Sequence, residues 1–309
     1  MSWKDTDPTR RRLLKLIGAL PLVAQGVRAA TAGGPIRKPI PSSGETLPVI
    51  GLGTSRVFDV SGSGAALDGL LEVLAALAAF DNAMIDTSPM YGEAERVVGE
   101  LLPRLNRPVR FFLATKVWTR GREAGIAQMD RSFRLLGAKV IDLMQIHNLL
   151  DWRTHIGTLR EWKAAGRIRY LGITHYREDA HDDLMRVMRE LPDLDFLQVN
   201  YSLLEPAAER RLLPLARERG VAVIANRPFG RGAWFRRTRG RPLPEWVQEA
   251  GIGSWAQFAL KWIVSHPAIT CAIPATAKAR HMLDNLQAAR GSLPDEAMRR
   301  RMRELARTL

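Results

Sequence analysis

The chain has 309 residues and a formal net charge of +14, and 46% of its residues are hydrophobic. A chain of this length and composition can bury a large core, as one α/β barrel or as two ordinary domains. The positive charge is spread along the sequence, which favours solvated surfaces and an anionic small ligand over a nucleic-acid interface. The single cysteine, Cys271, excludes an internal disulfide framework and a cysteine-based zinc site, and the sequence predicts no metal site.

The first 32 residues have the pattern of an export signal. A basic stretch with a twin arginine, residues 9–15, precedes an apolar segment, residues 16–23, which is too short to span a bilayer comfortably. The small-residue site Ala-Thr-Ala follows at residues 30–32. This order is typical of the bacterial twin-arginine route. We expect recognition by the twin-arginine export machinery, cleavage after Ala32, a periplasmic location and no stable membrane insertion; an ordinary basic amphipathic helix is the alternative.

From residue 36 onward, short apolar segments alternate with segments of helical periodicity. Residues 36–54 contain two apolar patches around a Ser-Ser-Gly-Glu turn, which predicts a hairpin that leads into the first strand. The expected strands span residues 49–53, 83–86, 111–116, 140–147, 168–174, 194–200, 221–225 and 270–274. The expected helices span residues 67–80, 93–105, 126–136, 152–165, 182–190, 209–219, 255–265, 282–289 and 294–307.

Eight alternating units predict that residues 33–309 form one (β/α)8 TIM barrel with an N-terminal β-hairpin. The turn at residues 51–54, Gly-Leu-Gly-Thr, lacks the third glycine of a dinucleotide-binding turn, which argues against an open doubly wound sheet. Residues 228–244 are rich in Gly, Arg and Pro and form the longest expected irregular segment, a candidate loop that closes over a ligand.

Polar side chains stand at or just after the ends of three consecutive expected strands. Asp86 ends the second strand and Tyr91 follows it by five residues, while Lys116 and His147 end the third and fourth strands. Because chemistry on a barrel gathers at the carboxyl ends of several strands, we expect one shared site. Each residue alone also fits a simpler role: a helix cap, a packed ring, a solvated strand end or a satisfied core histidine. A buried lysine and histidine are costly unless paired, so a shared site explains the four together better.

These residues make the chain similar to the aldo-keto reductase family. The Asp-Tyr-Lys-His tetrad of the family falls on Asp86, Tyr91, Lys116 and His147, with the five-residue step from Asp to Tyr kept. The resemblance covers the chain from about residue 36 and implies a (β/α)8 barrel that interconverts a small-molecule carbonyl and an alcohol with NADPH or NADH. The supporting matches are residues 51–54, 132–147, 166–176, 198–201 and 273–285.

The residue types fit that chemistry. Tyr91 would donate a proton to the carbonyl oxygen in reduction and accept it in oxidation, although a free tyrosine has a pKa of about 10. We expect the Lys116 ammonium to lower the pKa of Tyr91, and Asp86 to hold the lysine charged and oriented. His147 would position the carbonyl oxygen and stabilise the developing charge. Trp118 is a candidate wall of the substrate pocket, or equally a packing residue at the barrel rim.

The cofactor contacts implied by the resemblance depart from the common family pattern. Thr174 and His175 stand where many members have Ser-Asn against the nicotinamide amide, and Gln198 matches the family. Asn226 replaces an aromatic platform, which leaves the stacking contact to Phe229 or another residue. The expected cofactor contacts are Gly53, Thr54, Thr174, His175, Gln198, Asn226, Arg227, Pro228, Phe229, Pro274, Ala275, Thr276, Lys278, His281 and Asn285.

Cofactor choice depends on a second departure. The Lys and Arg that hold the 2′-phosphate in many members fall on Ala275 and His281, and Lys278 and Arg280 lie close by as replacements or as solvated cations. We expect NADPH as the cofactor, with NADH possible.

Two other functions fit parts of the sequence. An exported nicotinamide-cofactor-binding or sensing protein would not need efficient turnover, and the periplasm has no evident source of reduced nicotinamide. The complete tetrad favours the reductase. A nucleic-acid-binding module would predict steeply salt-dependent binding, and the scattered charge argues against it. We expect a monomer.

Overall fold

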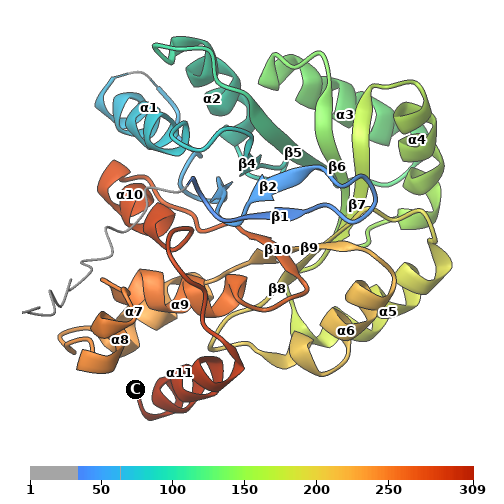
Figure 1. The fold of residues 1–309 in the computed structure, drawn as a ribbon. Helices are drawn as coiled ribbons and strands as arrows, with labels where there is room; N and C mark the ends of the chain where they lie inside the picture. Colours follow the sequence, from blue (N-terminus) through green and yellow to red (C-terminus); the bar gives the residue numbers. More distant parts are fainter. Residues whose placement is uncertain (1–33, 63) are drawn as a thin grey trace, which may run out of the picture. The chain divides into compact units, whose positions relative to one another are not determined.

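The computed structural model describes residues 34–62 and 64–309, and the predicted export signal lies outside these residues. In the described part, eight parallel strands form one sheet and helices surround it (Figure 1). The strands are β3 (Leu52–Gly53), β4 (Ala83–Asp86), β5 (Phe111–Val117), β6 (Ile141–His147), β7 (Ile168–Thr174), β8 (Phe196–Asn200), β9 (Ala222–Asn226) and β10 (Ile269–Ala272). This arrangement confirms the predicted (β/α)8 barrel.

The sheet closes on itself, so the carboxyl ends of its strands meet at one rim. Consecutive strands pair in parallel from β3 to β10. Two parallel bridges, from Ile50 to Ala272 and from Gly53 to Ala275, join the first strand region to the last. The first regular strand is shorter than the sequence predicts, because residues 49–51 contribute only part of this closing contact.

Helices follow the strands and cover the outside of the barrel (Figure 1). The α5 helix shows why: its apolar residues Leu184, Val187 and Met188 are buried against the barrel, whereas Asp183 and Arg186 face solvent. None of the helices in the described ranges is both long and apolar enough to cross a membrane. The helices are α1 (Ala65–Leu77), α2 (Ala94–Leu101), α3 (Arg122–Leu136), α4 (Trp152–Ala164), α5 (His181–Glu190), α6 (Leu212–Glu218), α7 (Ala233–Thr238), α8 (Glu245–Glu249), α9 (Trp255–Val264), α10 (Ala279–Gln287) and α11 (Glu296–Thr308).

The predicted N-terminal hairpin is present and covers one end of the barrel. Strands β1 (Arg37–Pro39) and β2 (Thr46–Pro48) pair antiparallel, and Figure 1 shows them lying across the barrel. The Lys38 ammonium donates hydrogen bonds to three carbonyls, those of Val264, His266 and Ile269, at 2.7–2.8 Å. Because Ile269 begins β10, the hairpin covers the amino-terminal end and leaves the opposite rim open.

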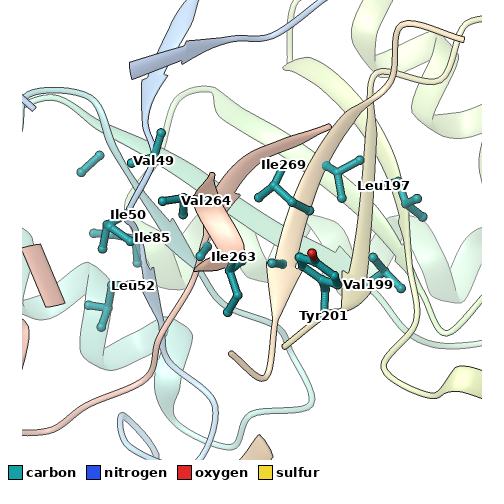
Figure 2. Packing of buried hydrophobic residues seen from close by; sticks show 14 of the residues in the cluster. Val49, Ile50, Leu52, Ile85, Leu197, Val199, Tyr201, Ile263, Val264 and Ile269 are labelled. Carbon is teal, nitrogen blue, oxygen red and sulfur yellow. The ribbon is translucent and has the colours of Figure 1, made fainter. Parts of the chain in front are cut away.

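Buried apolar side chains fill two layers. One set lies inside the barrel and includes Phe112, Leu143, Phe196 and Cys271. The larger set lies between the strands and the helices. Figure 2 shows part of it, which includes Leu197, Val199 and Ile269. A continuous core of this kind holds the strand ends in fixed positions.

Residues 228–244 are more regular than the sequence predicts. They contain a 3-10 helix, Gly230–Gly232, and the short α7 helix. Trp234 explains the order, because its ring is almost fully buried, stacks on Phe258 at 5.9 Å and donates a hydrogen bond from Nε1 to the Trp255 carbonyl at 2.7 Å. The prediction of an irregular loop is therefore wrong for half of this segment.

The C-terminal helix α11 carries an arginine that is largely buried. Arg299 of α11 is largely buried, pairs with Glu209 at 2.5 Å and donates to the Tyr201 hydroxyl at 2.9 Å. This contact fastens α11 to the chain segment after β8.

Candidate active site

Three neighbouring strands place the predicted catalytic residues at the open rim. Asp86 is the last residue of β4, Lys116 is the second-last of β5, and His147 is the last of β6. The strands β4, β5 and β6 are adjacent and parallel, and the register pairs Lys116 with Gln145 and His147 with Thr174. The apolar strands therefore bring these side chains to one point, as predicted from their positions in the sequence.

Asp86 and Lys116 form a buried ion pair. The Lys116 Nζ atom donates to Asp86 Oδ2 at 2.7 Å and to the Thr87 carbonyl at 2.6 Å, and both charged side chains are almost inaccessible to solvent. The other carboxylate oxygen of Asp86 accepts hydrogen bonds from Gln198 at 2.7 Å and Gln145 at 3.1 Å. Burial opposes the charge of Lys116, but Asp86 and Tyr91 raise the pKa of the lysine above its ordinary value, so it remains an ammonium.

Tyr91 lies beside this pair on the loop that follows β4. Its ring centre is 5.0 Å from Lys116 Nζ, and its backbone N–H donates to the Ser88 carbonyl at 3.0 Å. Burial raises the pKa of the Tyr91 phenol, and the Lys116 charge offsets only part of that effect. Lys116 therefore acts in the expected direction, but the net pKa of Tyr91 lies above its ordinary value because burial has the larger effect. The phenol is thus protonated at neutral pH, the form that a proton donor needs.

His147 is a neutral imidazole that faces Tyr91. Burial, followed by the positive charges of Lys116 and His175, lowers the pKa of His147 to about 2. The rings of Tyr91 and His147 meet edge to face with their centres 6.0 Å apart. The Trp118 ring centre lies 6.4 Å from that of His147 and the residue is 41% exposed, so it is positioned to contact a ligand at the histidine.

A cavity of about 650 Å³ opens at this rim and contains most of the predicted residues. The predicted residues Lys116, His175 and Trp118 are not part of its lining. Five predicted cofactor residues that follow β10 or lie on α10, namely Pro274, Thr276, Lys278, His281 and Asn285, also lie outside it. The predicted residues that line the cavity are Gly53, Thr54, Asp86, Tyr91, His147, Thr174, Gln198, Asn226, Arg227, Pro228, Phe229 and Ala275.

The cavity suits an anionic cofactor with an amide group. Arg56, Arg227 and Arg231 line it, and burial together with the charges of Arg231 and Arg56 lowers the pKa of Arg227. Three cations that repel one another in this way favour a bound phosphate. The Arg227 guanidinium stacks on the Tyr176 ring at 3.9 Å, which holds it in place.

Asn226 offers a further contact. Its Nδ2 atom donates to the His175 carbonyl at 3.2 Å, while its Oδ1 is buried without a hydrogen-bond partner among the described residues. A bound carboxamide N–H would satisfy that oxygen. The residues present therefore fit a nicotinamide dinucleotide, although Asn226 itself provides no aromatic stacking surface.

The basic residues at the start of α10 are available to an added phosphate. Lys278, Arg280 and His281 are exposed, and none of them forms an ion pair with another described residue. Thr276, which precedes them, is buried and accepts the Lys278 backbone N–H at 3.1 Å. The first of these cations, Lys278, follows three residues after Ala275, which lines the cavity.

Several site residues were not predicted from the sequence. Gln145 contacts Asp86, and Ser88 contacts His147. Gln145 stands two residues before His147 on β6, so the two side chains fall on the same face of the strand, and this spacing is the signal that could have identified Gln145. No spacing pattern identifies Ser88. The other lining residues that the sequence did not single out are Ser55, Arg56, Val57, Asp59, Met90, Tyr176, Arg231, Gly232, Phe235 and Ile273.

A sequence model of the aldo/keto reductase family matches residues 49–305, which includes every strand of the barrel. The chain belongs to the aldo/keto reductase family. Membership makes it an NAD(P)H-dependent oxidoreductase.

Known relatives support the assignment. The chain is 30% identical over 213 residues to methylglyoxal reductase YeaE of Escherichia coli (strain K12), which covers 65% of this chain and 72% of that protein. It is also 30% identical over 181 residues to the NADH-specific methylglyoxal reductase of the same strain, covering 48% and 53% of the two chains. The fold matches a crystal structure of an aldo/keto reductase from Klebsiella pneumoniae in complex with NADP and acetate, with a TM-score of 0.71, 24% identity and coverage of 85% and 93%.

Proposed function

We propose that this aldo/keto reductase reduces a small aldehyde or ketone to an alcohol, with Tyr91 as the general acid. The observation that carries the proposal is the buried Asp86–Lys116 pair beside the protonated Tyr91 and the neutral His147. A tyrosine, a lysine charge and a histidine then surround one point at the cavity where a carbonyl oxygen fits. A protein that only binds the cofactor would not need this arrangement of side chains.

Each of the four residues would have its own role in the reduction. A nicotinamide cofactor, when bound in the cavity, would supply the hydride for the carbonyl carbon. Charge then develops on the carbonyl oxygen, and Tyr91 Oη donates its proton to that oxygen. The Lys116 ammonium stabilises the phenolate that remains, and Asp86 keeps the ammonium charged and fixed in position. His147, being neutral, positions the carbonyl oxygen by a hydrogen bond without competing as an acid. In the reverse direction Tyr91 accepts the proton.

The cofactor would be NADPH, with NADH as the second candidate. Arg56, Arg227 and Arg231 would meet the phosphates that join the two nucleosides, and Asn226 Oδ1 would accept a hydrogen bond from the carboxamide. The exposed Lys278 and Arg280 would contact the 2′-phosphate that only NADPH carries. Because the Escherichia coli relative described above is NADH-specific, the activity with NADPH would be compared directly with the activity with NADH.

Methylglyoxal is the first substrate to test, because two relatives are methylglyoxal reductases. Residues 33–309 would be purified, and oxidation of NADPH and of NADH would be followed with methylglyoxal and a panel of aldehydes and ketones. We expect turnover with at least one small carbonyl and a higher kcat/KM with NADPH. Tight cofactor binding with no carbonyl reduced in the panel would contradict the proposal and favour the binding or sensing protein.

We also propose that the enzyme acts in the periplasm after export through the twin-arginine route. The basic stretch at residues 9–15 and the Ala-Thr-Ala site at 30–32 support it. The full chain and a variant with Arg10, Arg11 and Arg12 changed to lysine would be expressed in a bacterium that has the route. We expect the unchanged chain in the periplasmic fraction, shortened by 32 residues, and the variant in the cytoplasm. Equal distribution of the two would contradict the proposal.

A further inference from the structure

Ser88 connects the two residues that face the carbonyl in the proposed reaction. It lies in the loop after β4 and is fully buried. Its carbonyl accepts the N–H of Tyr91 at 3.0 Å, and its Oγ accepts the N–H of Met90 at 3.4 Å. The same Oγ lies 3.2 Å from Nδ1 of His147. One side chain therefore contacts both the loop that carries Tyr91 and the imidazole of His147.

The protons of this contact can be assigned from the partners available. A serine hydroxyl has one proton to donate, and Ser88 Oγ already accepts the Met90 N–H. Within residues 34–62 and 64–309, the one acceptor that its hydroxyl reaches is Nδ1 of His147. If Nδ1 itself carried the proton, the Ser88 hydroxyl would be buried with no acceptor, which costs free energy. The favoured arrangement has Ser88 as donor and Nδ1 as acceptor.

This hydrogen bond determines which ring nitrogen of His147 carries the proton. His147 is neutral, so its ring carries one proton on one of its two nitrogens. With Nδ1 accepting from Ser88, the proton is on Nε2, the nitrogen that does not contact Ser88, while the His147 ring lines the cavity. An Nε2–H group donates to a carbonyl oxygen, whereas the lone pair of the other tautomer would repel it.

We propose that Ser88 is a positioning residue that fixes His147 in the Nε2–H tautomer and so makes it a hydrogen-bond donor to the substrate carbonyl. The inference rests on the proposed carbonyl reduction for its functional consequence. The tautomer itself is a property of the protein without cofactor or substrate.

The first test is therefore spectroscopic. Protein labelled with ¹⁵N in histidine would be studied at pH 7 without ligands, because the ¹⁵N shifts of an imidazole separate protonated from unprotonated ring nitrogens. A His147→Asn variant identifies the His147 signals among the six histidines. We expect a single Nε2–H form in the unchanged protein and a mixture of both tautomers in Ser88→Ala. An Nδ1–H form in the unchanged protein overturns the proposal, even if the variant does not fold.

Ser202→Ala is the matched control. Ser202 is also buried and its Oγ also accepts a backbone N–H within its own loop, that of Glu205 at 3.1 Å, but among the described residues it forms no hydrogen bond with a histidine. We expect Ser202→Ala to leave the His147 signals unchanged. An equal change in both variants would mean that loss of a buried loop contact, and not the Ser88 hydroxyl, moves the tautomer, and would overturn the proposal.

Kinetics give the second test. We expect Ser88→Ala to lower kcat for the carbonyl about tenfold, with the Kd for NADPH unchanged in a fluorescence titration, and Ser88→Thr to recover most of the loss because it keeps the hydroxyl. A loss that Ser88→Thr does not recover, or a matching loss of NADPH binding, would overturn the positioning role. If the unchanged protein shows the Nε2–H form but reduces no carbonyl, the proposed function fails while the tautomer assignment stands.

Discussion

The most direct structural prediction concerns Asp86, whose carboxylate has three donors around it. Lys116 donates to Oδ2 at 2.7 Å, and Gln198 and Gln145 donate to Oδ1 at 2.7 and 3.1 Å. Asp86→Asn keeps the shape but replaces one oxygen with an NH₂ group. That group has no acceptor opposite it, and Lys116 loses its counter-charge in a site closed to water.

The expected cost follows from the burial of both partners. Breaking a fully buried ion pair by removing one charge typically costs about 3–5 kcal/mol, because the other charge stays buried and uncompensated. Asp86 and Lys116 are 2% and 0% exposed, so we expect a loss in this range. In a Lys116→Met background the same change should cost about 2 kcal/mol less, since no charge remains to be stranded.

Urea unfolding at pH 7, followed by tryptophan fluorescence, measures the loss. Asp193→Asn is the control, because Asp193 pairs with Arg160 at 2.6 Å but both side chains are more than 40% exposed. Such a pair contributes about 1 kcal/mol or less. If Asp86→Asn costs no more than the control, or costs the same with and without Lys116, the reasoning about the buried pair is refuted.

Three further predictions come from other parts of the molecule. Because the pKa of His147 is lowered to about 2, the unfolded chain binds a proton that the native state does not below pH 6.5. Above that pH His147 therefore has no effect on the free energy of unfolding. As the pH falls from 6 to 3, the free energy of unfolding decreases by about 1.4 kcal/mol per pH unit because of this histidine. Urea titrations at pH 7, 6 and 5 should show this extra slope in the unchanged protein and not in His147→Gln; parallel slopes would contradict it. Burial raises the pKa of the Cys271 thiol, so iodoacetamide at pH 8 should modify it only after unfolding in urea, and rapid labelling of the native protein would contradict the buried position. Lys278→Ala combined with Arg280→Ala should raise KM for NADPH about tenfold and leave KM for NADH unchanged, whereas equal changes would show that these cations do not read the 2′-phosphate.

The sequence was sufficient for the barrel and for the four residues at its rim. Each strand is a short apolar run, and a polar residue that ends such a run lies at the rim where the carboxyl ends of the strands meet. Asp86, Lys116 and His147 therefore fall together once the strands are counted, and Tyr91 follows because its loop is short.

The remaining site residues depend on contacts that no local pattern records. Arg56 and Arg231 lie 175 positions apart, yet both line one cavity because the first and seventh strands of the barrel end there. The pKa of Tyr91 depends on burial by the surrounding loops, which outweighs the neighbouring Lys116 charge. The α7 helix forms where an irregular loop was predicted, because Trp234 packs against a helix some twenty residues further along the chain.

The measurement that tests the proposed mechanism most directly compares the unchanged protein with Tyr91→Phe. Both would be titrated with NADPH by fluorescence and then assayed for NADPH oxidation with methylglyoxal or the best carbonyl of the panel. We expect equal NADPH affinity, because the aromatic ring is kept, and a loss of kcat of at least about a hundredfold, because the hydroxyl that donates the proton is removed. Turnover by Tyr91→Phe at a rate close to that of the unchanged protein would contradict the assignment of Tyr91 as the general acid.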